Sequence, residues 1–286
     1  LYIISLMKII DAHQHFWDPS RGDYSWMPQD NKILNRKYDL EDLTKDSKSI
    51  ELHKTVLVQA AATNAETEYM LNIAKNSDLV SGVVGWVNFE DPNQLEQLKT
   101  FSKNPKFVGV RPMIQDIPDE NWVLNKDFDI FFKTIIDLDL SFDALGFPIH
   151  LENFYIIASK YPSLRFVIDH LMKPKICNND PKEFDNWKNI MSKLSNLDNV
   201  YCKLSGMVTE ACENWTENDL KPYTNEILKI FTDKKILWGS DWPVCNLRTD
   251  YIGWLNTAQN LTNNLSLDQK QNIFYENAIK FYKLKI

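Results

Sequence analysis

The sequence has few of the features that mark disulfide-rich, nucleic-acid-binding or disordered proteins. It holds only four cysteines in 286 residues, none in a CxxC pair, so we expect neither a disulfide framework nor a zinc finger. We interpret them as reduced thiols of a cytoplasmic protein; they are Cys177, Cys202, Cys212 and Cys245. Basic residues form no block and the formal net charge is −7, which argues against nucleic acid as a partner. An aromatic content of 12% argues against disorder.

Long apolar runs are also lacking. The longest one near the N-terminus, residues 1–10, is too short to span a bilayer and has no small-residue cleavage site of a signal peptide. We therefore expect no membrane association. Met7 is the expected natural start, with residues 1–6 a leader or a cloning remnant. No low-complexity linker or change in composition marks a domain boundary, so we expect a single domain over 7–286.

What recurs along the chain is a short β-branched run, a polar turn and then a helical pattern. The candidate strands are 8–13, 54–60, 82–89, 106–112, 140–145, 164–169, 199–205 and 235–240. The candidate helices are 65–76, 92–103, 127–138, 151–161, 180–194 and 217–231. The strands are almost continuously apolar, as strands buried on both faces are. This alternation predicts an α/β fold, a single-domain (β/α)8 TIM barrel.

The competing fold is a doubly wound open sheet, which usually has a glycine-rich turn after its first strand. The HQHFWDP segment at 13–19 is not such a turn. One irregularity is the connection from 16 to 53, which is much longer than an ordinary strand-to-helix loop. Loops of this length usually carry function, so we expect this one to cap the mouth of the barrel.

In barrels of this kind the chemistry lies at the carboxyl ends of the strands. The chemically capable residues at the predicted ends are His13, His15, Arg111, Asp169, His170, Lys203, Ser205 and Asp241. Side chains alternate along a strand, so the first two histidines should face the same side. Three imidazoles and the carboxylate of Asp241 suit Zn²⁺ or Mn²⁺, with a position left for water.

Each of these residues also has a plain structural interpretation. The two histidines could simply be polar residues leaving a strand, and His170 could be a hydrogen-bonded core histidine. Asp241 could form a turn, Lys203 could be a buried ion-pair partner, and Arg111 could brace a loop. Their shared position at the ends of several strands favours a common site.

Other candidates are less firmly placed by the sequence. His53 precedes the second strand and is expected to be structural, at the opposite end of the barrel. His150 follows the fifth strand and is a candidate substrate-binding residue at the mouth. Four tryptophans are also expected near the mouth, where Trp17 and Trp242 could contact substrate, although core packing is the alternative for each; the four are Trp17, Trp26, Trp86 and Trp242.

An ordered series of motifs resembles the amidohydrolase superfamily, in particular the lactonase branch of its amidohydrolase-2 family. The resemblance runs from 10 to 284 and includes DAHQHFWDP, DYSWMP, YDLEDL, VLVQA, GVVGWVNF, GVRPMIQ, FDALGFPIHL, LRFVIDHLMKP, VYCKLSGM, WGSDWPVC and ENAIKFY. It implies hydrolysis of sugar lactones such as fuconolactone and rhamnonolactone, or of lactones from aromatic degradation. It also implies that His13, His15, His170 and Asp241 match the metal-and-base set of the superfamily.

The chain departs from the family pattern in two places. Gly146 stands where the family often has an arginine, so one substrate contact is absent or replaced. Superfamily members with two metals usually have a bridging lysine on the fourth strand, where this chain has Arg111, so at most one metal ion is expected. Some members of the branch work without a metal, and the motifs leave that version open.

The resulting hypothesis is attack of water on the carbonyl of a small-molecule lactone. Asp241 is the expected general base, with His170 and Lys203 as further catalytic candidates and Arg111 as a substrate contact. Only five arginines are present, which favours a neutral sugar lactone over a di- or tricarboxylate. The alternatives are a metal-dependent non-oxidative decarboxylase, a dicarboxylate lactone hydrolase and a non-catalytic sugar-binding barrel. The oligomeric state stays open, with a homodimer as one option.

Overall fold

Eight parallel strands form the centre of the molecule, paired in sequence order from β1 to β8. The computed structural model describes residues 7–286, so the predicted leader at 1–6 lies outside the described residues. The strands are β1 (Ile9–Gln14), β2 (Leu52–Val58), β3 (Val80–Gly85), β4 (Phe107–Val110), β5 (Ser141–Ala144), β6 (Arg165–Ile168), β7 (Val200–Leu204) and β8 (Ile236–Trp238).

The first and last strands meet and bring the sheet round into a barrel. The His15 N–H donates to the Trp242 carbonyl at 2.7 Å, and the Asp241 N–H donates to the His13 carbonyl at 2.8 Å. The (β/α)8 barrel predicted from the sequence is therefore confirmed, and the doubly wound sheet is excluded. The eight predicted strands all exist, with bounds within a few residues of the prediction.

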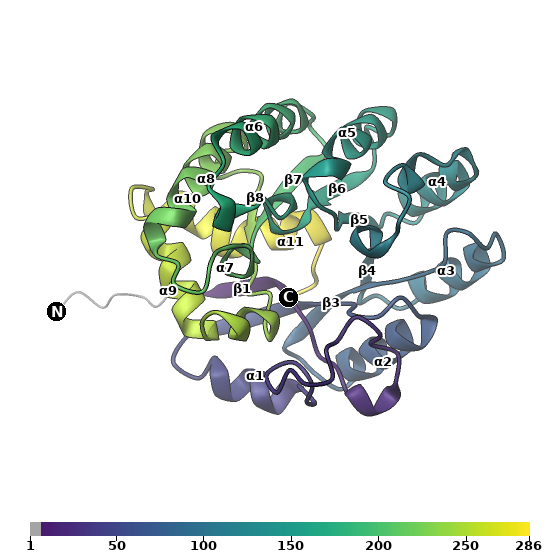
Figure 1. Cartoon of the computed structure of the whole chain (residues 1–286). Coiled ribbons are helices and arrows are strands. Elements are labelled where there is room, and N and C mark those ends of the chain that lie inside the picture. The colour runs from purple at the N-terminus through teal and green to yellow at the C-terminus, as the bar shows by residue number, and fades with distance from the viewer. Residues whose placement is uncertain (1–6) are drawn as a thin grey trace.

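The helices surround the strands (Figure 1). They are α1 (Leu40–Asp46), α2 (Asn64–Lys75), α3 (Gln94–Ser102), α4 (Asp129–Asp137), α5 (Leu151–Lys160), α6 (Pro181–Ser195), α7 (Met207–Glu210), α8 (Glu217–Ile230), α9 (Tyr251–Leu261), α10 (Leu267–Gln271) and α11 (Asn277–Tyr282). Side-chain N-caps explain where several of these helices begin. The Thr63 hydroxyl accepts the Glu66 N–H at the start of α2, and the Asp180 carboxylate accepts the Lys182 N–H at the start of α6. The short helix α1 interrupts the long segment 16–53 that the sequence suggested was a loop.

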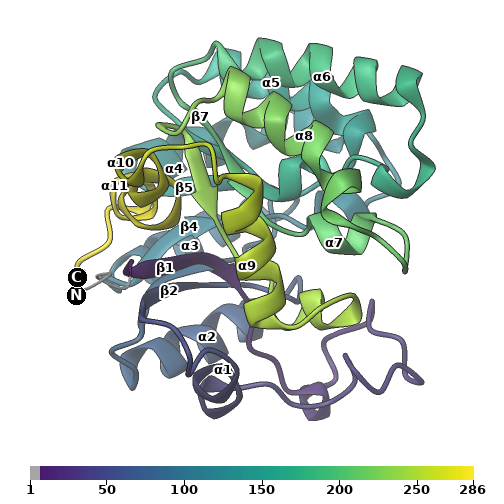
Figure 2. The same cartoon turned by 90° about the vertical axis from the view of Figure 1, so that its left-hand side faces the viewer.

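Small apolar residues of the strands fill part of the barrel interior. Valines and other small apolar residues of the strands pack there against aromatic side chains of the C-terminal segment, including Phe281 and Tyr282. In Figure 2, α10 and α11 lie at the same end of the barrel as the C-terminus, while α7 lies toward the other end. The C-terminal helices thus lie at the end of the barrel opposite to the carboxyl ends of the strands.

The cysteine prediction needs correction. Cys177 and Cys212, 35 positions apart, form a disulfide, whereas the sequence suggested four reduced thiols. Cys177 lies in the connection after β6 and Cys212 in the connection after β7, and these strands are neighbours in the barrel. Their wide spacing therefore conceals spatial proximity. Cys202 and Cys245 are free thiols, as expected, and both are buried. Within 7–286, no helix has the length and apolar character needed to cross a membrane.

Candidate active site

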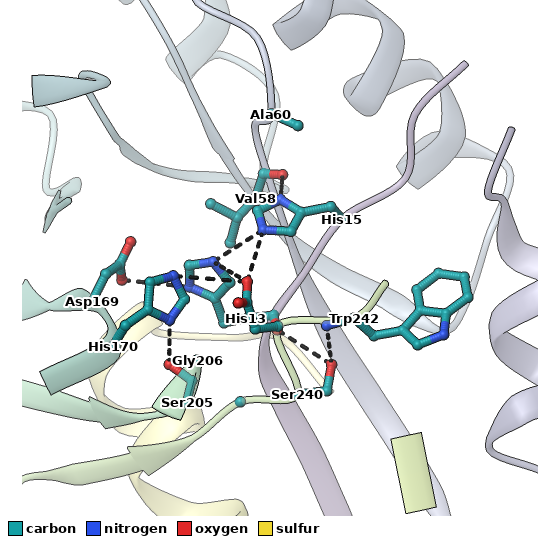
Figure 3. A network of polar contacts seen from close by, with 12 residues as sticks. His13, His15, Val58, Ala60, Asp169, His170, Ser205, Gly206, Ser240 and Trp242 are labelled. Atoms are coloured by element: carbon teal, nitrogen blue, oxygen red, sulfur yellow. Dashed lines mark hydrogen bonds and ion pairs between the residues drawn. The ribbon is translucent and has the colours of Figure 1, made fainter. Parts of the chain in front are cut away.

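Three histidines and one aspartate converge at the carboxyl end of the barrel. Figure 3 shows the three histidine rings, of His13, His15 and His170, turned toward one another. The Nε2 atoms of His13 and His15, both on or just beyond β1, are 3.2 Å apart. Oδ1 of Asp241, which follows β8, lies 3.3 Å from Nε2 of His15 and 3.7 Å from Nε2 of His13. Nε2 of His170, which follows β6, is also 3.7 Å from this oxygen. The structure thus gathers four of the predicted site residues around one point.

The backbone around this point is unusual. Asp241 and four consecutive residues from His170 to Lys173 have positive φ angles, which non-glycine residues rarely adopt. Such conformations persist only where surrounding contacts hold them, and they gather at functional sites. Gly206 also has a positive φ, and a Cβ atom there would come 2.5 Å from Nδ1 of His170. Glycine is therefore required for the His170 ring to lie where it does.

The orientation of His15 is fixed by the backbone of the neighbouring strand. Its Nδ1 lies 2.7 Å from the Val58 carbonyl, which can only accept, so Nδ1 carries the proton and donates. In the neutral ring Nε2 then carries a lone pair, and this lone pair points at Oδ1 of Asp241. Two acceptors this close repel each other unless a proton or a cation lies between them.

His13 and His170 are held by side chains beneath the cluster. Nδ1 of His170 is 2.9 Å from the Ser205 hydroxyl. Nδ1 of His13 is 3.0 Å from Nζ of Lys203 and 3.4 Å from Oδ1 of Asp169. Partners of this kind orient imidazole ligands and set which nitrogen presents its lone pair.

Lys203 lies at the centre of a fully buried ionic group. Its Nζ donates to Oδ2 of Asp143 at 2.6 Å and is 2.9 Å from Oδ1 of Asp169. The Tyr282 hydroxyl, from α11, donates to the same Asp143 oxygen at 2.6 Å. Lys203 is completely buried and does not line the cavity above the cluster. Its ammonium group contacts the His13 ring from the side away from the cavity lining, together with Asp143 and Asp169.

Arg111 is buried beside the cluster, directly after β4. One guanidinium nitrogen donates to Oδ2 of Asp169 at 3.3 Å, and the other donates to the carbonyl of Gln59. The Gln59 amide donates back to the Arg111 carbonyl at 2.7 Å. These contacts occupy much of the fork, so Arg111 has little capacity left for two-point binding of a substrate carboxylate.

The protonation states follow from burial and from these contacts. Burial lowers the pKa of His170 to about 4, although Asp241 and Asp169 favour its charged form. Burial also lowers the pKa of His13 and His15. For Asp241, burial raises the pKa, but the surrounding imidazoles of His170, His15 and His13 favour the carboxylate more strongly and hold the pKa below its ordinary value. At neutral pH the cluster is therefore a carboxylate among neutral imidazoles.

This donor set fits one divalent metal ion. Zn–N bonds of about 2.0–2.1 Å at roughly tetrahedral angles place two imidazole nitrogens a little over 3 Å apart, close to the separation seen here. His13, His15 and Asp241 offer ligand atoms within 4.8 Å of one another, as do His13, Asp169 and His170. Imidazole and carboxylate ligands suit Zn²⁺ and Mn²⁺ alike, and the donor set does not choose between them.

A small cavity of about 170 Å³ lies over the cluster. Trp17 and Trp26, both from the long segment after β1, form part of its wall. Their orientations are fixed, because the Trp17 indole donates to the Leu34 carbonyl at 3.1 Å and the Trp26 indole donates to the Ala60 carbonyl at 2.6 Å. Lys173 and Gln115 also line the cavity and hydrogen-bond to each other at 2.7 Å.

Sequence reasoning assigned no role to Lys173 or Gln115. Both lie in quoted motifs, HLMKP and RPMIQ, a few residues after a strand end, and that position was the available signal. Asp143 was also unassigned, although it lies within β5. Its apolar neighbours in the sequence gave no indication that it faces Lys203 inside the barrel.

Two predicted substrate contacts lie away from the cavity. Trp242 is fully buried, packs edge-on against Phe16 and Tyr38, and donates its indole N–H to Asp46 at 3.0 Å. His150 is buried after β5, and its Nδ1 accepts the Phe147 N–H at 3.0 Å. A Cβ on Gly146 would come 3.0 Å from this His150 nitrogen, so His150 occupies space near the position of the missing arginine.

His53 lies at the start of β2, 2.8 Å from the hydroxyl of Tyr275. This contact places it at the amino end of the barrel, in agreement with the structural role expected from its position.

A (β/α)8 barrel with such a histidine-rich cluster at its carboxyl end defines an enzyme of the amidohydrolase type. The amidohydrolase family matches residues 10–284, and the chain belongs to this family. An L-fucono-1,5-lactonase of Burkholderia ambifaria is 35% identical over 96% of this chain and 95% of its own length. An L-fucono-1,5-lactonase of Burkholderia multivorans is 30% identical over 85% of this chain and 84% of its own. A crystal structure of an amidohydrolase from Burkholderia multivorans with bound zinc has a TM-score of 0.91 at 28% identity, covering 97% of this chain and 99% of that one.

Proposed function

We propose that this protein is a lactonase that hydrolyses the ring ester of a sugar-acid lactone of the fucono- or rhamnonolactone type. The observation that carries the proposal is the convergence of three imidazole nitrogens on one ionised carboxylate at the floor of a small, tryptophan-walled cavity. The two lactonases of similar sequence, which align along most of their length, support the same conclusion. Such a reaction belongs to carbohydrate metabolism, and the lactone is the small-molecule partner.

Asp241 is the general base in this proposal. It takes a proton from water as the oxygen of that water bonds to the lactone carbonyl carbon, and it returns the proton to the ring oxygen as the ring C–O bond breaks. The products are balanced, since one lactone and one water give one hydroxy acid. A carboxylate with a low pKa is a weak base, so the proton moves together with bond formation rather than before it.

The developing oxyanion needs nearby positive charge or hydrogen-bond donors. Arg111 and Lys173 are the cationic side chains that line the cavity, and His170 lies at its floor. His13, His15, His170 and Asp241 are the residues that would hold a metal ion. That ion, when bound, would polarise the lactone carbonyl and lower the pKa of the attacking water. Lys203 acts indirectly, because it holds His13 and Asp169 in place.

The cavity favours a neutral sugar lactone over a dicarboxylate. The Arg111 guanidinium already donates to Asp169 and Gln59. It therefore has no free pair of N–H groups with which to bind a substrate carboxylate. Indole rings such as those of Trp17 and Trp26 offer flat apolar walls to a sugar ring. The segment 16–53, which supplies both rings, is the proposed cap of the barrel mouth.

A panel of aldonolactones, followed by acid release with a pH indicator, tests the proposal. We expect turnover of at least one six-carbon or deoxy-sugar lactone, measured with and without chelator and with added Zn²⁺ or Mn²⁺. Dicarboxylate lactones and aromatic acids belong in the same panel. Failure to hydrolyse any sugar lactone, together with CO₂ release from an aromatic acid, would assign the site to a decarboxylase instead.

A further inference from the structure

A second, larger cavity opens beside the catalytic one at the same end of the barrel. Its volume is about 610 Å³, and it shares the side chains of Trp26 and Met113 with the catalytic cavity. We call this cavity the outer pocket; the residues used below to define it are Asp23, Trp26, Trp86, Glu90, Asp116 and Trp122. They come from the segments that follow β1, β3 and β4, so the outer pocket is built on the same strand ends as the site.

Three indole rings contribute to the walls of the outer pocket, and two of them are fixed by hydrogen bonds. The Trp122 indole donates to Glu90 at 2.8 Å, and the Trp26 indole donates to the Ala60 carbonyl. Trp86 follows β3 directly, and its backbone N–H and carbonyl both hydrogen-bond to the Thr67 hydroxyl. Rigid aromatic faces of this kind lose little freedom when a ring stacks on them.

The charges of the two cavities differ in sign. Asp23, Glu90 and Asp116 contribute carboxylates to the outer pocket, and no lysine, arginine or histidine of 7–286 lines it. The catalytic cavity has two cations, Arg111 and Lys173, against the single carboxylate of Asp241. One oxygen of Asp23 binds Arg21 at 2.6 Å and Thr63 at 3.0 Å, while its other oxygen is buried without a partner among the described residues. The outer pocket thus offers hydrogen-bond acceptors and repels anions.

We propose that the outer pocket binds an uncharged sugar unit carried by the lactone, so that the preferred substrates are glycosylated aldonolactones. The inference rests on the proposed function, because the lactone ring must occupy the catalytic cavity. The carbonyl end then lies by the cationic residues, where the product carboxylate forms, and the distal hydroxyl-bearing end passes Trp26 into the outer pocket. Hydroxyl groups donate to the carboxylates, and the sugar ring stacks on indole.

Matched pairs of lactones test this inference. Gluconolactone is compared with its 4-O-galactosyl and 4-O-glucosyl derivatives, and fuconolactone serves as an independent unsubstituted lactone. We expect kcat/KM to be about tenfold higher for a glycosylated member than for its bare partner, as one well-formed aromatic contact would give. Hydrolysis of bare lactones with no gain from the glycosyl unit would overturn this inference alone. No hydrolysis of any sugar lactone would overturn the proposed function as well.

Variants locate the effect in the outer pocket. Trp86→Ala should remove most of the preference for glycosylated lactones and leave bare lactones unaffected, while Trp86→Phe, which keeps a ring, should retain most of it. Trp215→Ala is the matched control, because Trp215 is a half-buried tryptophan that lines neither cavity. A preference that survives Trp86→Ala would overturn the inference. So would a stronger preference for lactones bearing an amino group, because it would assign the carboxylates to a cation.

Discussion

Lys203 of β7 and His13 of β1 are 190 positions apart in the chain, yet Nζ of Lys203 lies 3.0 Å from Nδ1 of His13. The same ammonium group pairs with the buried carboxylates of Asp143 and Asp169. It is therefore both a counter-charge of two buried acids and a contact of one ring of the histidine cluster. A single lysine thus connects the stability of the barrel to the geometry of the site.

Replacing this lysine should be costly to the fold. Lys203→Met leaves the buried carboxylate of Asp143 without a cation and Asp169 with Arg111 alone, and breaking a buried pair in this way typically costs about 3–5 kcal/mol. We expect the free energy of unfolding, measured with urea, to fall by that amount, and Asp143→Asn in the same chain to restore part of it. Lys193→Met removes an exposed pair with Glu152 and should change the free energy by less than about 1 kcal/mol. Equal effects of the two lysine variants would contradict the assignment.

The disulfide predicts a thiol count and a stability change. Unfolded protein kept without reductant should react with a thiol reagent at two cysteines, Cys202 and Cys245, and at all four after reduction. Since the bond closes a loop of 35 residues, the chain-entropy relation gives a loss of about 4 kcal/mol in the free energy of unfolding on reduction. Four reactive thiols before reduction would show that Cys177 and Cys212 are not bonded.

Glu66 on α2 provides a pH-dependent contact with the segment that carries Trp17 and Trp26. Its carboxyl group accepts from the Tyr24 hydroxyl at 2.8 Å and from the Ala60 N–H at 3.0 Å, and its side chain is buried. Burial raises the pKa of Glu66 to about 7 from 4.5, despite these hydrogen bonds. The folded state therefore holds a proton between pH 4.5 and 7 that the unfolded state has released, and this contribution to stability falls as the pH rises through that window.

Glu66→Gln isolates this effect, because glutamine keeps a carbonyl acceptor but does not ionise. The free energy of unfolding of the wild type minus that of the variant should fall by on the order of 2–3 kcal/mol between pH 4.5 and pH 8. Urea titrations at several pH values give the difference directly. Parallel stability curves for the two proteins would mean that the carboxyl group titrates near its ordinary pKa.

Nε2 of His15 and Oδ1 of Asp241 are two acceptor atoms in close contact, which predicts that a metal ion binds between them. This binding can be measured without an activity assay. Chelator-treated protein should show a higher Tm when Zn²⁺ is added, because an ion that binds only the folded state stabilises it. His15→Ala should abolish most of this shift, while His53→Ala, at the other end of the barrel, should keep it. An unchanged Tm in the wild type would favour a proton rather than a metal ion between these groups.

Some features of the structure could be predicted from the sequence and others could not. The strands were predictable because each is a short, nearly continuous apolar run, and the barrel then brings every carboxyl end to one face, which places His13, His15, His170 and Asp241 near each other. The direction in which Trp242 and His150 point was not predictable, because no strand alternation applies to residues beyond a strand end. The Trp242 indole donates to Asp46 of α1 instead of facing the cavity. His150 accepts a backbone N–H and also does not face the cavity.

The remaining features depend on contacts between distant segments. The Cys177–Cys212 pair joins two loops whose nearness follows only from the order of β6 and β7 in the barrel. Lys173 lines the cavity because four residues in succession have positive φ, a conformation that no local residue preference predicts. Asp143 required a partner, Lys203, that is 60 positions away.

Asp241 is the proposed acceptor of the proton from the attacking water. The most direct measurement is kcat for a sugar lactone with the Asp241→Asn variant beside Asp129→Asn, a matched change of an aspartate at the surface pair with Lys160. We expect Asp241→Asn to lower kcat by about 10²–10⁴-fold with an unchanged circular dichroism spectrum, and Asp129→Asn to leave kcat within the error of the assay. An Asp241→Asn variant that hydrolyses the lactone at the wild-type rate would contradict the account.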